Sequence, residues 1–442
     1  MSAVGENPTY GRGDGADSST SALWSHNCRW TDLLVPVSVE AGRRDLDLRD
    51  GWTRRWTASW RAGETPVVSP VRALADAPVS GGTRLCGPRV RNPMLLGYLH
   101  TLDETRLQAL AEATRLTPAE AHSLLLGPLA ARYGPLDPHY TRRATPMRVI
   151  NNNPWVWTTT WRYCPQCLAG DPDDAIQQLH GGAWRRHWRL PPVFSCLTHR
   201  RLLRHLCPGC HTLVATAEMI DRTDEDDLHP TQCRRRGCGT QLADPQCHAE
   251  PGLDAPTRRV LDRLQRRFAR LLSPSAPPTV RSTGWPIPAA QYFMDLRTVT
   301  ALTLLSWPAA RPLCATPLLA QALDAEAAWR QHEYERLLRG AKKHSSQAFL
   351  RPAVDALAGA AVLHVADRLL RLDEAQARDA LAPLTEAAAS RATALTSYLR
   401  HLPGSSLPLQ LALTSCAPRG AGRQWLADAL HERECQRTRH VA

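Results

Sequence analysis

Four close pairs of cysteine and histidine residues constrain this chain more than any other feature of its sequence. The pairs are Cys164/Cys167, Cys196/His199, Cys207/Cys210 and Cys233/Cys238. Two ligands separated by two residues can bind one ion, because the turn between them directs both donor atoms inward. Two such pairs complete the tetrahedral shell that Zn²⁺ takes in structural sites. The spacing therefore predicts two structural zinc ions.

The order of the pairs leaves two ways of sharing the ligands. In a sequential assignment, one ion takes Cys164, Cys167, Cys196 and His199, and the other takes Cys207, Cys210, Cys233 and Cys238. In a cross-braced assignment, the first pair joins the third and the second joins the fourth. We favour the sequential order, because it closes shorter loops and loop closure costs entropy. Each long stretch between pairs is expected to carry a hairpin or a short helix.

The totals bound the class of protein. A length of 442 residues predicts two to four domains. No apolar segment resembles a signal peptide or a membrane span, which favours a cytoplasmic chain without membrane association. In that compartment paired cysteines bind metal more often than they form disulfides. The remaining cysteines are interpreted as ordinary thiols, and they are Cys28, Cys86, Cys247, Cys314, Cys416 and Cys435.

The net charge of +12 favours a polyanionic partner, most commonly nucleic acid. A GC-rich genome, which enriches arginine, is the compositional alternative. Arginines around the metal pairs are the candidate DNA contacts: Arg185, Arg186, Arg189, Arg200, Arg201, Arg204, Arg234, Arg235 and Arg236. The last three lie between two ligands, so the ion would hold them in place. Five tryptophans in this region are expected to fill space around the metal sites, with base stacking as the second interpretation.

Four regions follow along the chain. Residues 1–90 remain unassigned and are expected to be partly disordered. Residues 91–150 predict a helical region in which Thr117-Pro118-Ala119-Glu120 is a capping box that opens a helix continuing through Leu126. Together with the helix before it, around Leu107–Thr114, this resembles a helix-turn-helix unit. A small helical hairpin without a DNA role is the alternative.

Residues 151–248 form the predicted zinc-finger region, and residues 249–442 a C-terminal helical domain. Its first helix, from Thr257, has an apolar stripe and an opposite face rich in arginine that either follows DNA or is simply solvated. A Pro/Ser-rich linker is expected at Ser273–Pro288, and a second helix-turn-helix rhythm at Ala353–Ala380. Further helices are expected over residues 291–307, 317–339, 353–371, 374–400 and 422–434.

Catalytic motifs are not found. His248 and Glu250 match half of a deaminase signature, but the Cys-x-x-Cys pairs lie upstream of them. The acidic run at residues 221–227 comes from one local segment, unlike the converging carboxylates of a two-metal site. Zinc sites with four protein ligands leave no position for water. The sequence therefore predicts that the protein is not an enzyme. A redox protein would need a thioredoxin-like context that is absent.

A resemblance adds to this interpretation. Four stretches follow one another in an order that resembles the TniQ family: Arg162-Tyr163-Cys164-Pro165-Gln166-Cys167-Leu168, Trp188-Arg189-Leu190-Pro191-Pro192-Val193, Cys196-Leu197-Thr198-His199 and Leu206-Cys207-Pro208-Gly209-Cys210. These are TnsD-like target-selection proteins of bacterial transposons. The resemblance weakens across the helical parts, covers about residues 92–442 and does not extend before residue 90. It implies helix-turn-helix and zinc-finger modules, the eight ligands as zinc-binding residues, and recruitment of an AAA+ regulator and a transposase.

The expected fold is therefore mainly α, with helix-turn-helix modules flanking two tandem structural zinc fingers and a C-terminal helical domain. The expected function is non-catalytic binding of double-stranded DNA to select a target site for transposition. A protein–protein adaptor of a transposition complex, without direct DNA contact, is the alternative. The sequence does not determine the oligomeric state, and a homodimer is compatible with it.

Overall fold

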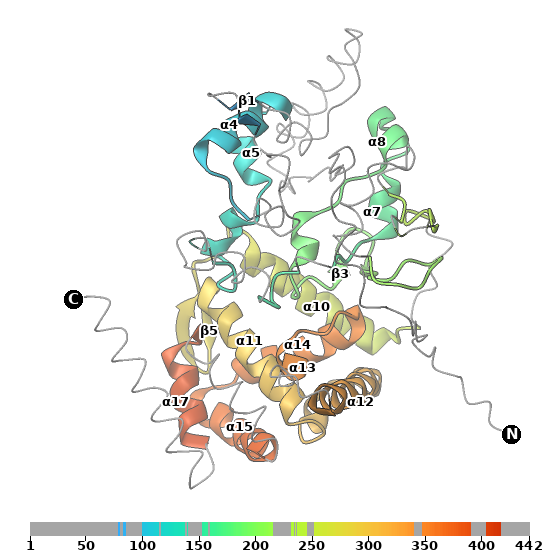
Figure 1. The fold of residues 1–442 in the computed structure, drawn as a ribbon. Coiled ribbons are helices and arrows are strands. Elements are labelled where there is room, and N and C mark those ends of the chain that lie inside the picture. Colours follow the sequence, from blue (N-terminus) through green and yellow to red (C-terminus); the bar gives the residue numbers. More distant parts are fainter. Residues whose placement is uncertain are drawn as a thin grey trace, which may run out of the picture.

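The computed structural model describes the chain in several stretches, and these are mainly helical (Figure 1). It describes residues 78–79, 83–84, 100–137, 139, 153–214, 231–244, 252–339, 347–389 and 404–416, except positions 115, 158, 159, 234 and 236. The expected mainly helical class is confirmed within these ranges. Among the helices described, none combines the length and the apolar character needed to cross a membrane.

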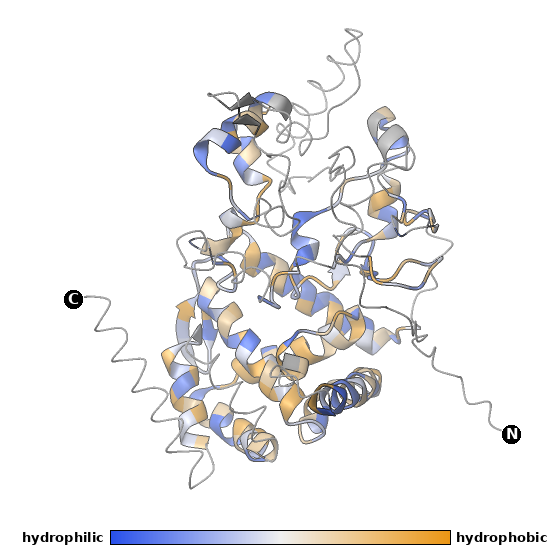
Figure 2. Cartoon of the chain, viewed as in Figure 1, coloured by the Kyte–Doolittle hydropathy of each residue, from blue (hydrophilic) through white to orange (hydrophobic). Residues whose placement is uncertain are grey.

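The largest helical assembly is built around α11 (Ala289–Leu305). This helix is apolar or carries threonine on most sides, and Phe293, Val299 and Leu302 are fully buried, as expected of a helix inside a core. The assembly also contains α10 (Ala255–Leu272), η5 (Arg311–Leu313), α12 (Pro317–Arg339), α13 (Gln347–Leu350), α14 (Ala356–Leu370), α15 (Glu374–Ala389) and α17 (Leu407–Cys416). Helix α14 packs against α10, α11 and α12, and Figure 2 shows that it is largely hydrophobic.

Several expected helices agree closely with those observed. The helix expected at residues 317–339 is α12, with the same bounds. Helix α10 begins two residues before Thr257, because the Asp254 side chain accepts a hydrogen bond from the backbone N–H of Thr257 at 2.7 Å. Helix α15 ends at Ala389. Residues 390–403 and the helix expected at 422–434 lie outside the described residues.

The linker expected at Ser273–Pro288 is corrected by the structure, since this segment contains a β-hairpin. Strand β5 (Thr279–Ser282) pairs antiparallel with β6 (Trp285–Pro288). Thr283 and Gly284 form the two-residue turn with φ values of 46° and 84°, as the tight turns of hairpins require. The prolines of β6 concealed this strand in the sequence, and they are tolerated because a two-stranded ribbon has open edges.

The expected capped helix in the N-terminal part is present. Helix α4 (Glu104–Thr114) is followed by α5 (Pro118–Ser123). Thr117 Oγ1 accepts a hydrogen bond from Glu120 N at 3.2 Å, and Thr117 N donates to the Glu120 carboxylate at 2.7 Å. Leu107, Leu110 and Leu125 belong to a small core of their own. Helix α5 ends before Leu124–Leu126, which were expected to continue it, and η2 (Gly127–Ala131) follows.

Two short strands, β1 (Pro78–Val79) and β2 (Thr83–Arg84), pair antiparallel ahead of these helices. The helix expected around Met94–Leu99 lies outside the described residues.

The segment with the metal-ligand pairs is built of short elements. They are α7 (Pro165–Ala169), α8 (Ala175–His180), η4 (Arg186–Arg189), β3 (Ser195–Cys196) and β4 (Arg201–Leu202). Trp155, Trp184 and Trp188 are buried among them, so these indoles fill space as expected and present no face for base stacking. Their buried cluster is continuous with that of the C-terminal helices.

Candidate metal centres and their arginines

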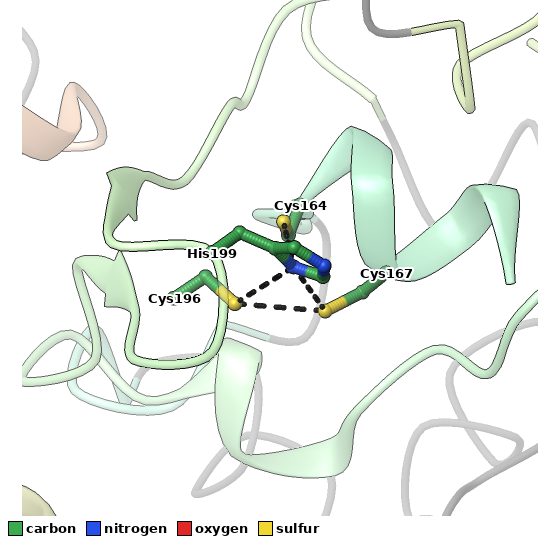
Figure 3. A group of neighbouring side chains, drawn as sticks. All are labelled: Cys164, Cys167, Cys196 and His199. Atoms are coloured by element: carbon green, nitrogen blue, oxygen red, sulfur yellow. Dashed lines mark hydrogen bonds between the residues drawn. The ribbon is translucent and has the colours of Figure 1, made fainter. Parts of the chain in front are cut away.

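The first candidate metal centre lies where α7 meets the turn between β3 and β4. Cys164 is the N-cap residue of α7, and Cys167 lies one turn into the helix, so both sulfur atoms face the same side. Cys196 ends β3, and His199 lies in the turn that follows. The four side chains point toward one another (Figure 3).

The donor atoms of this centre have the spacing of a tetrahedral zinc shell. His199 Nδ1 lies 3.4 Å from Cys164 Sγ, 3.3 Å from Cys167 Sγ and 3.5 Å from Cys196 Sγ. The Sγ atoms of Cys167 and Cys196 are 3.5 Å apart. Zn–S and Zn–N bonds of ordinary length place such atoms about 3.5–3.8 Å apart at tetrahedral angles. The residues therefore fit a metal ion of this size.

Crowding of the thiols has an electrostatic consequence. The pKa of Cys196 is lowered, because the thiols of Cys164 and Cys167 donate hydrogen bonds to its sulfur. The pKa of Cys167 is raised, because the sulfur atoms of Cys164 and Cys196 hold its proton. Without a cation, one thiolate is thus stabilised at the expense of its neighbours. A divalent ion would remove that repulsion and let all three thiols ionise.

The second candidate metal centre joins Cys207, Cys210, Cys233 and Cys238. Sulfur atoms lie 3.6 Å apart between Cys207 and Cys238, and 3.8 Å apart between Cys210 and Cys233. Burial raises the pKa of Cys233. Burial acts in the same direction on Cys238, but hydrogen bonds with Thr240 outweigh it and lower the pKa of that thiol to about 6.

The loops of this second centre depend on two glycines. Gly237, just before Cys238, has a φ of 72°, a conformation that side chains rarely adopt. A Cβ atom on Gly209 would lie 2.0 Å from Thr240 Oγ1. Glycine at position 209 therefore lets the Cys207–Cys210 turn approach the Cys233–Cys238 loop.

The structure groups the eight donors sequentially. All donor atoms within each group of four lie within 4.8 Å of one another, and the described residues contain no cross-braced grouping. The loop between Cys167 and Cys196 carries α8 and η4, short helices of the kind expected there. Most of the loop between Cys210 and Cys233, including the acidic run at 221–227, lies outside the described residues, as do His248 and Glu250.

Two of the arginines expected to contact DNA phosphates are buried, which corrects that expectation. Arg189 is 4% exposed, donates to the carbonyl of Trp157 at 2.9 Å and lies over the ring of Trp161. Arg201 is 6% exposed. Both arginines lie inside the fold of the metal-binding segment, where a phosphate cannot reach their guanidinium groups.

The other candidate arginines have different environments. Arg186 donates to the backbone carbonyls of Ser123 and Leu125, and so connects η4 to the end of α5 and to the segment that follows it. Arg185 and Arg204 are half-buried, while Arg200 and Arg235 are exposed. Arg234 and Arg236 lie outside the described residues.

Sequence reasoning missed two buried polar residues that position the first centre. Arg162, two residues before Cys164, donates to the carbonyls of Pro191, Val193, Ala353, Val354 and Asp355. The Gln265 side chain on α10 accepts hydrogen bonds from the N–H groups of Phe194 and Ser195, at 2.8 and 2.9 Å. Arg162 stands in the motif that resembles the TniQ family, but its role and that of Gln265 could not be predicted, because their partners are backbone groups distant along the chain.

The comparisons with known proteins bear on the same segment. Residues 80–203 match the model of the TniQ family, and they include the whole first centre. No curated protein and no solved structure matches the chain. The match begins before residue 90, which corrects the expected start of the resemblance, and it ends before Cys207. Residues 80–203 are thus similar to the TniQ family, and this match suggests a protein related to transposition.

Proposed function

We propose that this protein is a non-catalytic, zinc-containing DNA-binding protein that selects the target site for transposition and recruits the transposition machinery. The observation that carries the proposal is the TniQ match over residues 80–203, together with one four-donor centre inside that range and a second that follows it in the chain. In this proposal both centres hold Zn²⁺, and the four donors of each leave no coordination position for a substrate or a water. The ions therefore hold loops in place and do no chemistry.

Within this proposal the chain divides as the sequence suggested, into 91–150, 151–248 and 249–442, with residues 1–90 unassigned. Helices α4 and α5 form the helix-turn-helix unit, supported by the capping box at Thr117 and by their own small core. The turn between α14 and α15 is a weaker candidate, since Glu374 and Asp379 are exposed on α15 and would repel phosphates.

In this proposal the protein binds double-stranded DNA, an AAA+ transposition regulator and a transposase, and it does so in the cytoplasm. Of the arginines predicted to contact phosphates near the metal centres, Arg200 and Arg235 are exposed, and this proposal assigns the contacts to them first. Loss of either metal would release the loops that carry them.

The adaptor alternative has a specific observation in its favour. Leu407 and Leu411, one turn apart on α17, are 66% and 58% exposed, and exposed leucines on one helix face are typical of protein contacts. An adaptor would bind the other transposition proteins and leave DNA untouched.

A gel shift at physiological salt separates the two functions. The full chain with two zinc ions should shift duplex DNA, and chelation should abolish the shift. Loss of affinity with rising salt should be steep, because phosphate contacts release counterions. A zinc-loaded chain that leaves duplex DNA unshifted while it binds a transposition protein would favour the adaptor.

A further inference from the structure

We infer that the exposed face of α10 is a phosphate-backbone contact surface for duplex DNA; this inference rests on the proposed function. The face carries Arg259, Arg263, Arg266 and Arg270, which are all exposed. We call these four residues the α10 arginine stripe.

Helix geometry places the four side chains of the stripe in one row. Their spacing of four, three and four residues keeps successive members within one arc of the helix surface. Leu261, Leu264 and Phe268 lie on the opposite side and are buried. Figure 2 shows both hydrophilic and hydrophobic colours along α10. The stripe spans roughly 16 Å along the axis, a length over which one DNA strand presents about five phosphates.

The charges of the stripe are poorly balanced by the rest of the described protein. Asp262 is the acid that pairs with it, at 3.4 Å from Arg266. Among the described residues, Arg259, Arg263 and Arg270 have no acidic partner within ion-pair distance. Like charges three or four residues apart on a helix repel one another. A row of four arginines therefore costs stability unless a polyanion lies along it.

More positive charge flanks the stripe on both sides. Arg200, 64% exposed, reaches across from the first metal centre to Asp262, with 3.0 Å between Nη2 and Oδ2. On the other side, Arg263 and Arg371 both act to lower the pKa of His364 on α14, after burial as the main cause. Arg371 is itself 63% exposed. The basic surface thus extends from the first metal centre across α10 to the end of α14.

The backbone segment that carries Cys196 and His199, two ligands of the first metal centre, packs against α10. Arg200 directly follows His199 and has a φ of 52°, and Gln265 binds the backbone just before Cys196. A metal ion at that centre would fix the loop on one side of α10.

The test removes three charges from the stripe and keeps the Arg266–Asp262 pair. The variant is R259Q/R263Q/R270Q in the full, zinc-loaded chain. A matched control, R311Q/R336Q/R378Q, removes the same charge from exposed arginines that are paired with Asp324, Glu333 and Glu374. Zinc content and thermal unfolding verify that both variants fold. Binding to one duplex DNA is measured by fluorescence anisotropy from 50 to 200 mM salt.

The stripe variant should bind at least tenfold more weakly at the highest salt that still allows wild-type binding to be measured. Its plot of log affinity against log salt concentration should be shallower by about 2.7, since each phosphate contact contributes about 0.9 to the slope. The control should keep the wild-type slope. Equal effects of the two variants, or none from the stripe variant, would overturn the inference and leave the proposed function standing. A wild-type chain that binds no duplex DNA would overturn both.

Discussion

The guanidinium group of Arg162 lies so close to Gly359 that a Cβ atom at position 359 would approach Arg162 Nη2 to 2.8 Å. The same Cβ atom would lie 3.2 Å from the carbonyl oxygen of Ala353, which accepts a hydrogen bond from Nη2 at 2.8 Å. Gly359 therefore leaves room for a buried cation that connects the metal-binding segment to the start of α14.

This contact predicts the effect of Gly359→Ala. Alanine suits a helix better than glycine, yet here the added methyl group should push Arg162 off its carbonyl partners. We expect the free energy of unfolding to fall by about 1–3 kcal/mol, the usual cost of overpacking a core. Urea denaturation measures it. Gly252→Ala is the control, because nothing lies within 4 Å of a Cβ atom there; a neutral Gly359→Ala would refute the contact.

Replacing one ligand of each centre tests the grouping of the donors. Cys196→Ser should lose one zinc ion per chain and expose residues 160–203 to protease, while Cys233→Ser should lose the other ion. Structural zinc is worth about 10–16 kcal/mol in small modules, so each loss should unfold its own loops. Elemental analysis and limited proteolysis are the measurements.

The control for both ligand variants is Cys314→Ser, because Cys314 lies outside the two groups of donors. It should keep two zinc ions. A Cys196→Ser protein that also keeps two would exclude the first centre.

The metal pairs and the capping box could be predicted from the sequence because they depend on local spacing. Cys164 and Cys167 lie one helical turn apart whatever surrounds them, and the Thr117 cap needs only Glu120. Local spacing could not separate the exposed arginines, which can contact phosphates, from the buried ones. Arg189 and Arg200 cannot be distinguished by their sequence context. Arg189 stacks on Trp161 inside the fold, whereas Arg200 is exposed. That difference arises from packing between distant segments.

The β-hairpin at residues 279–288 was missed for a related reason. Pro286 and Pro288 signal a linker, yet Ile287 between them is buried and the strand pairs over all four residues. The role of Arg162 could not be predicted either, since its carbonyl partners lie about 30 and 190 residues away. Local patterns cannot anticipate such partners.

Acid should destabilise the protein through His100. Burial is the main cause that lowers its pKa to about 4 from 6.5, and the nearby charge of Arg189 adds to the effect. The native state therefore binds fewer protons at this site than the unfolded chain between these two values. Stability from this site is complete above pH 6.5 and is lost as the pH falls toward 4, by up to about 3 kcal/mol.

His100→Asn should flatten that part of the pH dependence. Urea denaturation at pH 7.5 and at pH 5 measures the free energy of unfolding of both proteins. The difference between wild type and variant should be smaller at pH 5 than at pH 7.5. The control is His332→Gln, a change at an exposed position, and it should follow the wild type. His364, whose pKa burial also lowers, would keep part of the slope in both. Parallel curves for His100→Asn and wild type would contradict the assignment.

Gln265→Leu should loosen the first metal centre from a distance. The leucine has a similar size but cannot accept the hydrogen bonds of the Phe194 and Ser195 N–H groups, and leaving buried donors unpaired costs about 1–3 kcal/mol each. Because Ser195 directly precedes Cys196, the β3 backbone should become more mobile and zinc should leave that centre faster. Release into a chromogenic chelator should then show one fast and one unchanged ion, whereas Gln376→Leu on the exposed face of α15 should leave both rates as in wild type. If both ions leave Gln265→Leu at their wild-type rates, α10 does not support the first centre.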